Sequence, residues 1–194
     1  MLVFFTNMFI PPGFSYIDSM EVQPIQFFTA TVLRWIPILN NDVYKDIIIN
    51  SLSFLVKNKR VKVYGFVIMP NHIHLIWQVQ EGYELKNVQR DFLRFTSQQI
   101  QKDLRTNHPK TQRRLEVNLK DRKYQLWQRN PLSIDLFSRE MIEQKLEYIH
   151  HNPVQAKWQL VDDFVNYTFS SASYYEEDDT SFDFLSHYME YLGW

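Results

Sequence analysis

The amino-acid sequence predicts an α+β fold in which helices pack on one face of a mainly antiparallel sheet. Three segments rich in aromatic and β-branched residues predict strands, and a two-residue turn signal separates the second from the third. Two longer segments place apolar residues at helical spacing. The resulting order of strand, helix, hairpin and helix is typical of an α+β domain.

The first strand and the first helix are predicted in the N-terminal third of the chain. Residues 25–33 (IQFFTATVL) suit a strand that is buried on at least one face. Residues 42–57 predict an amphipathic helix. Asn40 or Asn41 is available as its N-terminal cap. The apolar positions expected on this helix are Val43, Ile47, Leu52 and Leu55.

A hairpin and a second helix follow. Residues 61–69 (VKVYGFVIM) and 72–79 (HIHLIWQV) predict two strands that are joined by the turn signal Pro70-Asn71. Residues 83–104 predict an amphipathic helix. Its apolar face holds Leu85, Val88, Phe92, Phe95, Ile100 and Leu104. A basic stripe elsewhere on this helix holds Lys86, Arg90 and Arg94.

The next segments have weaker patterns. Residues 107–123 are polar and basic with little periodicity, so we expect a long loop that becomes ordered on a partner. Residues 140–152 predict a third helix, which ends before Pro153. Its apolar positions are Ile142, Leu146 and Ile149.

We expect one domain over residues 20–175, flanked by two different ends. Residues 1–19 start with an apolar run (MLVFFTNMFI) that has no basic flank and is too short to span a bilayer. Neither a signal peptide nor a membrane anchor is therefore expected, and we interpret this segment as an extension or a misassigned start. Residues 176–194 are expected to form an acidic and aromatic tail.

The composition limits the chemistry that the chain can perform. Its 194 residues are 45% apolar, which is sufficient for a folded core. The absence of cysteine excludes disulfides and thiolate metal sites, so the six histidines become the candidate metal ligands.

The charges are segregated along the chain although the net charge is only -1. Residues 86–129 hold twelve Lys or Arg and four Asp or Glu, whereas residues 160–194 hold eight acids and no Lys or Arg. A basic central segment can bind phosphates whatever the total charge, and the acidic run 176–179 would face away or shield the groove. The alternative is two ordinary solvated surfaces.

His72 and His74 are a candidate metal-binding pair. Residues two apart in a strand point to the same face, so the two imidazoles lie side by side while Ile73, Leu75 and Trp77 face the other way. Two neighbouring imidazoles can chelate one metal. The alternative is that one histidine is exposed and the other is satisfied by a hydrogen bond in the core.

Tyr148 is a candidate nucleophile, and it shares a helix face with Asn152 four residues later. A phenol has a pKa of about 10, so its attack on phosphate near neutral pH needs a nearby cation. A metal held by His72, His74 and Asn152 would supply that cation. The alternative is that Tyr148 packs at a helix end while Asn152 caps the carbonyls before Pro153.

Three segments of the chain resemble one known family. They are YGFVIMPNHIHLIW (64–77), EYIHHNPVQAKWQLV (147–161) and YTFSSASYY (167–175). From about residue 25 to residue 175 the chain is similar to the REP-associated tyrosine transposases, which are single-tyrosine transposases of the HUH endonuclease group. The N-P-V and S-S-A segments point to the transposases of that group rather than to its replication initiators and relaxases.

The resemblance implies a ferredoxin-like or RRM-like sheet, with the histidine pair on a central strand and the nucleophile on a following helix. It implies that Tyr148 is the catalytic nucleophile and that His72, His74 and Asn152 bind Mg²⁺ or Mn²⁺. His151 would be an alternative ligand or a proton shuttle. The substrate would be single-stranded DNA with REP-like hairpins, cut to leave a 5'-phosphotyrosine and a free 3'-hydroxyl. A monomer or a homodimer, cytoplasmic and associated with a prokaryotic nucleoid, is expected.

The chain departs from the family pattern at two places. Residues 128–140 (QRNPLSIDLFSRE) replace a stretch that often holds aromatic residues and histidine, which puts an accessory contact there in doubt. Lys157 and Trp158 replace the glycine that usually follows N-P-V, so the local turn is expected to differ.

The predicted function is therefore cleavage and transfer of a DNA strand. Contacts with the DNA backbone are expected from Lys86, Arg90, Arg94, Arg113, Arg114, Arg122 and Lys123. Trp127 is a candidate for stacking on an unpaired base, with burial in the core as the alternative. Three other functions stay open: a nicking replication initiator or relaxase, a hairpin-binding protein that does not cut, and a metal-dependent hydrolase that activates water.

Overall fold

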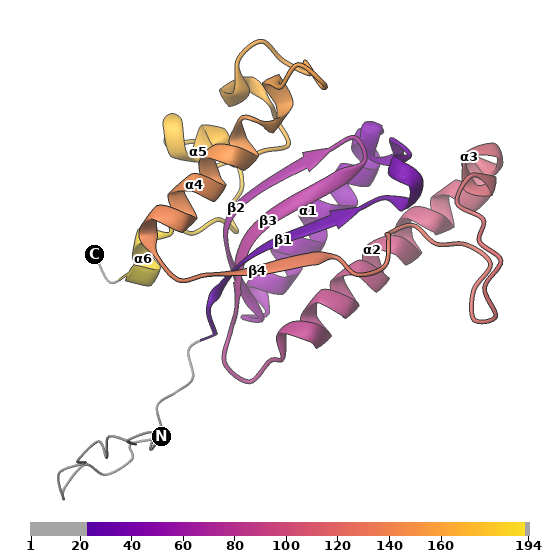
Figure 1. Ribbon diagram of the computed structural model, residues 1–194, viewed down its shortest axis with the longest axis horizontal. Coiled ribbons are helices and arrows are strands. Elements are labelled where there is room, and N and C mark those ends of the chain that lie inside the picture. The colour runs from indigo at the N-terminus through magenta and orange to yellow at the C-terminus, as the bar shows by residue number, and fades with distance from the viewer. Residues whose placement is uncertain (1–22, 193–194) are drawn as a thin grey trace, which may run out of the picture.

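An open four-stranded sheet lies at the centre of the computed structural model, which describes residues 23–192. The core elements in chain order are β1 (Ile25–Thr31), α1 (Asp42–Lys57), β2 (Val61–Met69), β3 (His72–Val79), α2 (Leu85–Asn107) and β4 (Leu132–Leu136). The strands are ordered β2-β3-β1-β4, and each neighbouring pair is antiparallel (Figure 1). This order and connectivity are ferredoxin-like, so the predicted fold class is confirmed. The predicted extension at residues 1–19 lies outside the described residues.

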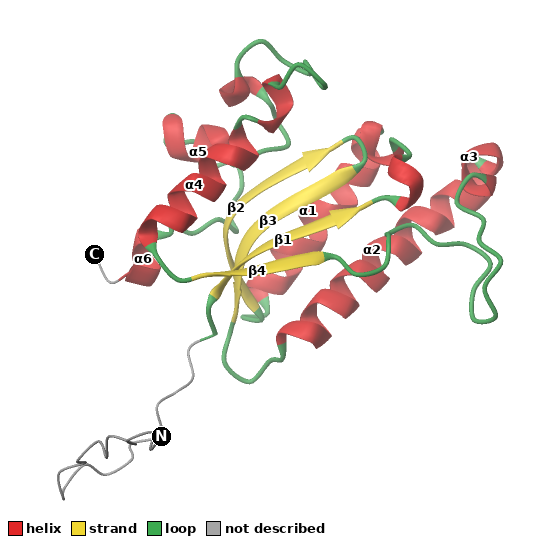
Figure 2. Cartoon of the chain, viewed as in Figure 1, coloured by secondary structure: helices red, strands yellow, loops and turns green. Residues whose placement is uncertain are grey.

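The other described elements are short, apart from one helix, and most of them follow the core (Figure 2). The helices are α3 (Pro109–Arg113), α4 (Arg139–His150), α5 (Ala172–Glu176) and α6 (Met189–Leu192). The 3₁₀ helices are Leu33–Trp35, Ile38–Asn40, Asn152–Val154 and Phe164–Asn166. Within residues 23–192, no helix is long and apolar enough to cross a membrane.

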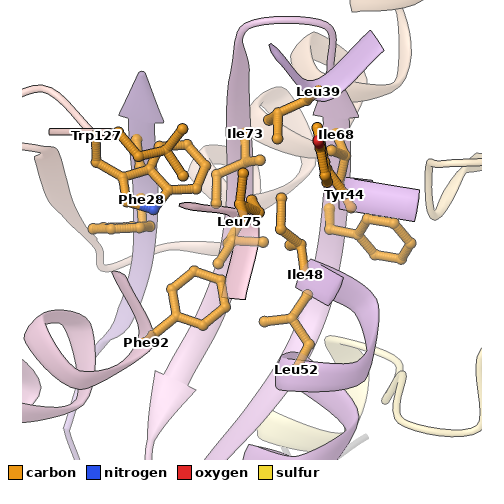
Figure 3. Packing of buried hydrophobic residues seen from close by; sticks show 14 of the residues in the cluster. Phe28, Leu39, Tyr44, Ile48, Leu52, Ile68, Ile73, Leu75, Phe92 and Trp127 are labelled. Atoms are coloured by element: carbon orange, nitrogen blue, oxygen red, sulfur yellow. The ribbon is translucent and has the colours of Figure 1, made fainter. Parts of the chain in front are cut away.

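One face of the sheet is covered by α1 and α2. Ile73, Leu75 and Trp77 of β3 point to this face, as their alternation predicts. Ile73 and Leu75 pack there with Ile48 of α1 and Phe92 of α2 (Figure 3). Trp127 is also buried in this cluster, where its Nε1 donates a hydrogen bond to Thr96 Oγ1 at 3.0 Å. The prediction that Trp127 stacks on a base is therefore wrong, and its alternative of core burial is right.

The predicted apolar positions of α1 are wrong at its start. Val43 is 56% exposed, whereas Tyr44 and Ile48 are buried. The inward face begins at Tyr44 because its ring packs in the core and its hydroxyl donates a hydrogen bond to Asp103 on α2 at 2.6 Å. In α2, Phe95 is likewise half-exposed, while the other apolar positions are buried or partly buried.

The opposite face of the sheet is covered by α4, which packs against β2 and β3. Its Ile142, Leu146 and Ile149 are buried with Phe27 of β1 and Val67 of β2. The predicted packing of helices on one face therefore holds for α1 and α2. The prediction is wrong for α4, which forms a further layer on the second face. The face that carries both histidines is therefore partly covered by the helix that carries Tyr148.

The outer edge of β2 is covered by segments that follow α4. Ser170 pairs with Val67 in an antiparallel bridge, and Leu185 pairs with Val63 in a parallel one. Phe184 is buried in the cluster under α1 and α2. The segment after residue 176 therefore packs on the sheet and protects an edge strand.

Candidate active site

His72 and His74 lie side by side on β3, at the end of the sheet where β2 turns into β3. Their ring centroids are 4.7 Å apart, and both side chains are buried. Successive side chains of β3 point to opposite faces of the sheet, and Ile73, between the two histidines, is buried under α1 and α2. Both histidines therefore point to the α4 face. The sheet therefore holds two imidazoles next to each other, as predicted.

Each imidazole is oriented by one neighbouring oxygen. His74 Nδ1 lies 2.7 Å from Thr29 Oγ1 on β1, which pairs with His74 in the sheet. His72 Nδ1 donates to Asn71 Oδ1 at 2.8 Å, because an amide oxygen only accepts. With Nδ1 engaged, Nε2 is the nitrogen left for a ligand. Within residues 23–192, His74 Nε2 is buried and has no hydrogen-bond partner.

Burial keeps both histidines neutral near pH 7. It lowers the pKa of His74 to about 3, with smaller contributions from His72 and from the ammonium of Lys145. Burial and the ammonium of Lys157 lower the pKa of His72 to about 4. Neutral imidazoles can bind a metal without first losing a proton.

Tyr148 reaches this pair from α4. The helix starts at the cap Ser138, whose Oγ accepts from Met141 N at 3.3 Å, and its apolar residues fix its rotation on the sheet. The Tyr148 ring centroid lies 5.4 Å from that of His74, and the side chain is 45% exposed. The Lys145 Nζ lies 5.8 Å from the same ring. The phenol is therefore open to solvent beside the histidine pair and a cation.

Asn152 and His151 follow at the end of α4. Asn152 is buried, and its Nδ2 donates to the Tyr148 carbonyl at 3.2 Å, so the amide caps the helix end. His151 is exposed, its Nδ1 donates to the Glu147 carbonyl at 3.0 Å, and its ring packs on Phe164. Within residues 23–192, no group of three or more His, Cys, Asp or Glu could hold a metal. The third ligand predicted for the pair, Asn152, offers an amide oxygen in place of such a group.

The predicted DNA-contacting residues fall into two groups. Lys86, Arg90 and Arg94 are exposed on the first half of α2, over the face opposite Tyr148. The second group lies around α3 and the turn after it, and holds Arg113, Arg114, Arg122 and Lys123. This second region, residues 113–123, is tied to the histidine end of the sheet by Arg34, which donates to the Arg114 carbonyl at 2.8 Å. The prediction of a long loop over 107–123 is wrong at its start, since α3 spans Pro109–Arg113.

Sequence patterns do not identify Thr29, Asn71 and Lys145 as parts of this site. Thr29 is found only once the pairing of β1 with β3 is known. Asn71 directly precedes His72 in the turn between the two strands, and this adjacency is the one sequence feature that could have suggested a contact between them. Lys145 lies three residues before Tyr148, a spacing that places both on one helix face.

Comparisons with known proteins identify the family of the chain and a similar fold. The family model for IS200-like transposases matches residues 30–152, which include both histidines, Tyr148 and Asn152. A comparison with curated proteins found no match. The structure of a REP-associated tyrosine transposase bound to a REP hairpin is similar in fold. It has a TM-score of 0.57 and 17% identity, over 89% of this chain and 88% of that one.

A crystal structure from Deinococcus radiodurans R1, named as a candidate transposase, is also similar. Its TM-score is 0.46 and its identity is 13%, over 74% of this chain and 97% of that one. The family assignment depends on the family model, which covers more than half of the 194 residues. The chain belongs to the family of IS200-like transposases.

Proposed function

We propose that this transposase cuts and rejoins single-stranded DNA through a covalent bond between Tyr148 and a DNA phosphate. The observation that carries the proposal is the buried Nε2 of His74, which has no hydrogen-bond partner among residues 23–192 and lies in a ring close to the exposed side chain of Tyr148. A buried nitrogen without a partner costs stability unless it binds a ligand. A nucleophile beside such a nitrogen supports a metal-assisted reaction at phosphate.

The donor set fits Mg²⁺ or Mn²⁺ in the proposed site. His72 and His74 would hold the metal through Nε2, and the side-chain oxygen of Asn152 would be the third protein ligand. The amide oxygen suits Mg²⁺ and Mn²⁺, the two imidazoles favour a transition metal over Mg²⁺, and an incomplete protein shell leaves room for the phosphate oxygens and water that Mg²⁺ prefers. When bound, such a metal polarises the phosphodiester and neutralises the charge that develops on it.

Residues of the chain would perform the other parts of the reaction. Tyr148 Oη attacks the phosphorus and loses its proton to solvent, with His151 as an alternative acceptor. The bond between phosphorus and the 3'-oxygen breaks, and that oxygen leaves as a hydroxyl after it takes up a proton. The product is a 5'-phosphotyrosine, which keeps the bond energy, so a 3'-hydroxyl can later reverse the step and rejoin the strand.

The proposed substrate is single-stranded DNA that folds into REP-like hairpins, in line with the REP hairpin in the similar solved structure. The basic residues of α2 and of the region around α3 would contact its phosphates. We further propose a transposase domain over residues 20–175, a monomer or homodimer, and a cytoplasmic site of action at the nucleoid.

Denaturing electrophoresis tests the proposal directly. The protein and its Tyr148→Phe variant are mixed with labelled single-stranded hairpin DNA, with and without Mn²⁺. We expect a protein-DNA adduct that resists denaturation, formed only with the metal and only by the unmodified protein. Cleavage without an adduct would instead identify a metal-dependent hydrolase. Binding with neither adduct nor cleavage would identify a hairpin-binding module.

A further inference from the structure

Two tryptophans and one lysine surround His72, and the proposed chemistry does not use them. The ring centroid of His72 lies 6.2 Å from that of Trp35 and 5.8 Å from that of Trp158. Lys157 Nζ lies 5.4 Å from the centroid of Trp35 and 5.3 Å from that of Trp158. Segments before α1 and after α4 thus place two indoles around one ammonium, next to a proposed metal ligand.

The backbone holds Trp35 in place while its side chain stays exposed. Arg34 and Trp35 have φ angles of 56° and 57°, a left-handed conformation that residues other than glycine adopt rarely. The Trp35 carbonyl accepts from Asn71 Nδ2 at 3.1 Å, and Oδ1 of the same amide accepts from His72 Nδ1. The Trp35 side chain is nevertheless 53% exposed. A strained backbone that presents an indole to solvent beside an active site indicates ligand binding.

The chemistry of this cluster fits unpaired nucleotides. Indoles stack on nucleobases with little regard to sequence, and an ammonium pairs with the phosphates between them.

We infer that Trp35, Lys157 and Trp158 form a binding site for the unpaired nucleotides that flank the scissile phosphate. The two indoles stack on bases, and Lys157 Nζ contacts a neighbouring phosphate. The inference rests on the proposed function, because that function makes DNA the ligand.

The test measures binding without requiring catalysis. The full chain with Tyr148→Phe is titrated, without divalent metal, against fluorescein-labelled oligothymidine and against an oligonucleotide of equal length made of abasic sites. The two probes carry the same phosphates, so their difference reports on bases. We expect Trp35→Ala and Trp158→Ala to weaken oligothymidine binding about tenfold each and to leave abasic binding unchanged. Trp35→Phe should restore most of the affinity.

Lys157→Gln separates the phosphate contact from stacking. It should weaken the binding of both oligonucleotides by the same factor and lower the slope of log affinity against log salt by about 0.7. The matched control is Phe54→Ala, since Phe54 is 55% exposed on α1 over the opposite face. Its binding to both probes should equal that of the parent protein.

Two results would overturn the inference. One is that the tryptophan variants bind oligothymidine as tightly as the Phe54→Ala control, and the other is an equal loss on both probes. Failure of the proposed function is seen separately, in the adduct assay. An adduct without base-dependent binding refutes this site alone, and base-dependent binding without an adduct refutes only the tyrosine chemistry.

Discussion

Single hydrogen bonds decide which nitrogen each histidine offers to a ligand. Thr29 engages Nδ1 of His74 from the neighbouring strand, and Asn71 engages Nδ1 of His72 from the turn. Such partners of a metal ligand fix its tautomer and its ring orientation. The affinity of the pair for metal should therefore depend on residues that do not touch the metal.

Thr29→Val tests this dependence, because valine keeps the shape of threonine and removes its hydroxyl. We expect the dissociation constant for Mn²⁺, measured by isothermal calorimetry, to rise by about 10- to 100-fold. Thr31→Val is the matched control, because Thr31 lies on the same strand and the same face as Thr29. Among residues 23–192, Thr31 makes no side-chain hydrogen bond to His72 or His74. Equal affinity of the two variants would contradict an orienting role for Thr29.

Buried His150 makes stability depend on pH. Its Nε2 lies 2.9 Å from Ser171 Oγ, and burial lowers its pKa from 6.5 to about 4, with a smaller contribution from His151. Below pH 6.5 the unfolded chain binds this proton more readily than the folded chain. The stability due to neutral His150 is therefore complete above pH 6.5 and is lost as the pH falls towards 4.

We expect His150→Gln to reduce this dependence, because glutamine keeps a hydrogen-bonding group near Ser171 and does not titrate. The difference in unfolding free energy between pH 7.5 and pH 5, from urea titrations without metal, should shrink by up to about 2 kcal/mol. Contributions from His72 and His74 are present in both proteins and cancel. The same pH dependence in both proteins would show that His150 is not responsible.

At the scale of elements, the position of α4 decides whether Tyr148 meets the histidine pair. Gly65 of β2 permits this position, since a Cβ there would lie 2.6 Å from Leu146 Cδ2 and 3.3 Å from Ile149 Cδ1. Ser171 adds a bridge, because its Oγ accepts from Phe66 N at 3.0 Å and also meets His150. The glycine and the serine together bring α4 close to the sheet.

Gly65→Ala would press a Cβ against the buried side-chain ends of Leu146 and Ile149, so these side chains, or α4 with them, must shift. We expect the unfolding free energy to fall by about 1–3 kcal/mol, and the rate of adduct formation to fall as well because Tyr148 moves with the helix. Leu146→Val removes the Cδ2 atom, so the double variant should recover part of both losses relative to Gly65→Ala. If Gly65→Ala alone changes neither quantity, the close approach of α4 is not required.

The sequence predicts elements well where their residues are buried and poorly where they are exposed. The apolar runs of β2 and β3 and the turn between them predict that His72 and His74 lie side by side on one strand. The spacing of Ile142, Leu146 and Ile149 predicts α4. β4 is not predicted because Leu132, Ser133 and Ile134 are exposed on an edge strand, which leaves no buried face to read. The face of the sheet that α4 covers depends on long-range packing, which no local pattern records.

At the scale of the whole molecule, the two groups of basic residues lie at opposite ends of α2. Tyr148 and both histidines lie on the α4 face, at the end where β3 begins. The region 113–123 is joined to that end through Arg34, next to Trp35, whereas the first half of α2 lies on the opposite face and starts after the far end of β3. DNA bound at Tyr148 reaches the first half of α2 only if it passes around the sheet.

This separation predicts that the two basic groups act on DNA of different length. Arg122 and Arg90 are a matched pair, because each is exposed and bound to an adjacent aspartate. Arg122→Gln should weaken binding of a short unpaired oligonucleotide and lower its salt slope by about 0.7, because Arg34 joins the region 113–123 to the histidine end of the sheet. Arg90→Gln should leave that probe unaffected and weaken only a long hairpin, which extends to the other face. Fluorescence anisotropy with both probes at several salt concentrations measures all four cases. If Arg90→Gln weakens the short probe as much as Arg122→Gln does, DNA enters across α2, and the α4 face alone does not form the binding surface.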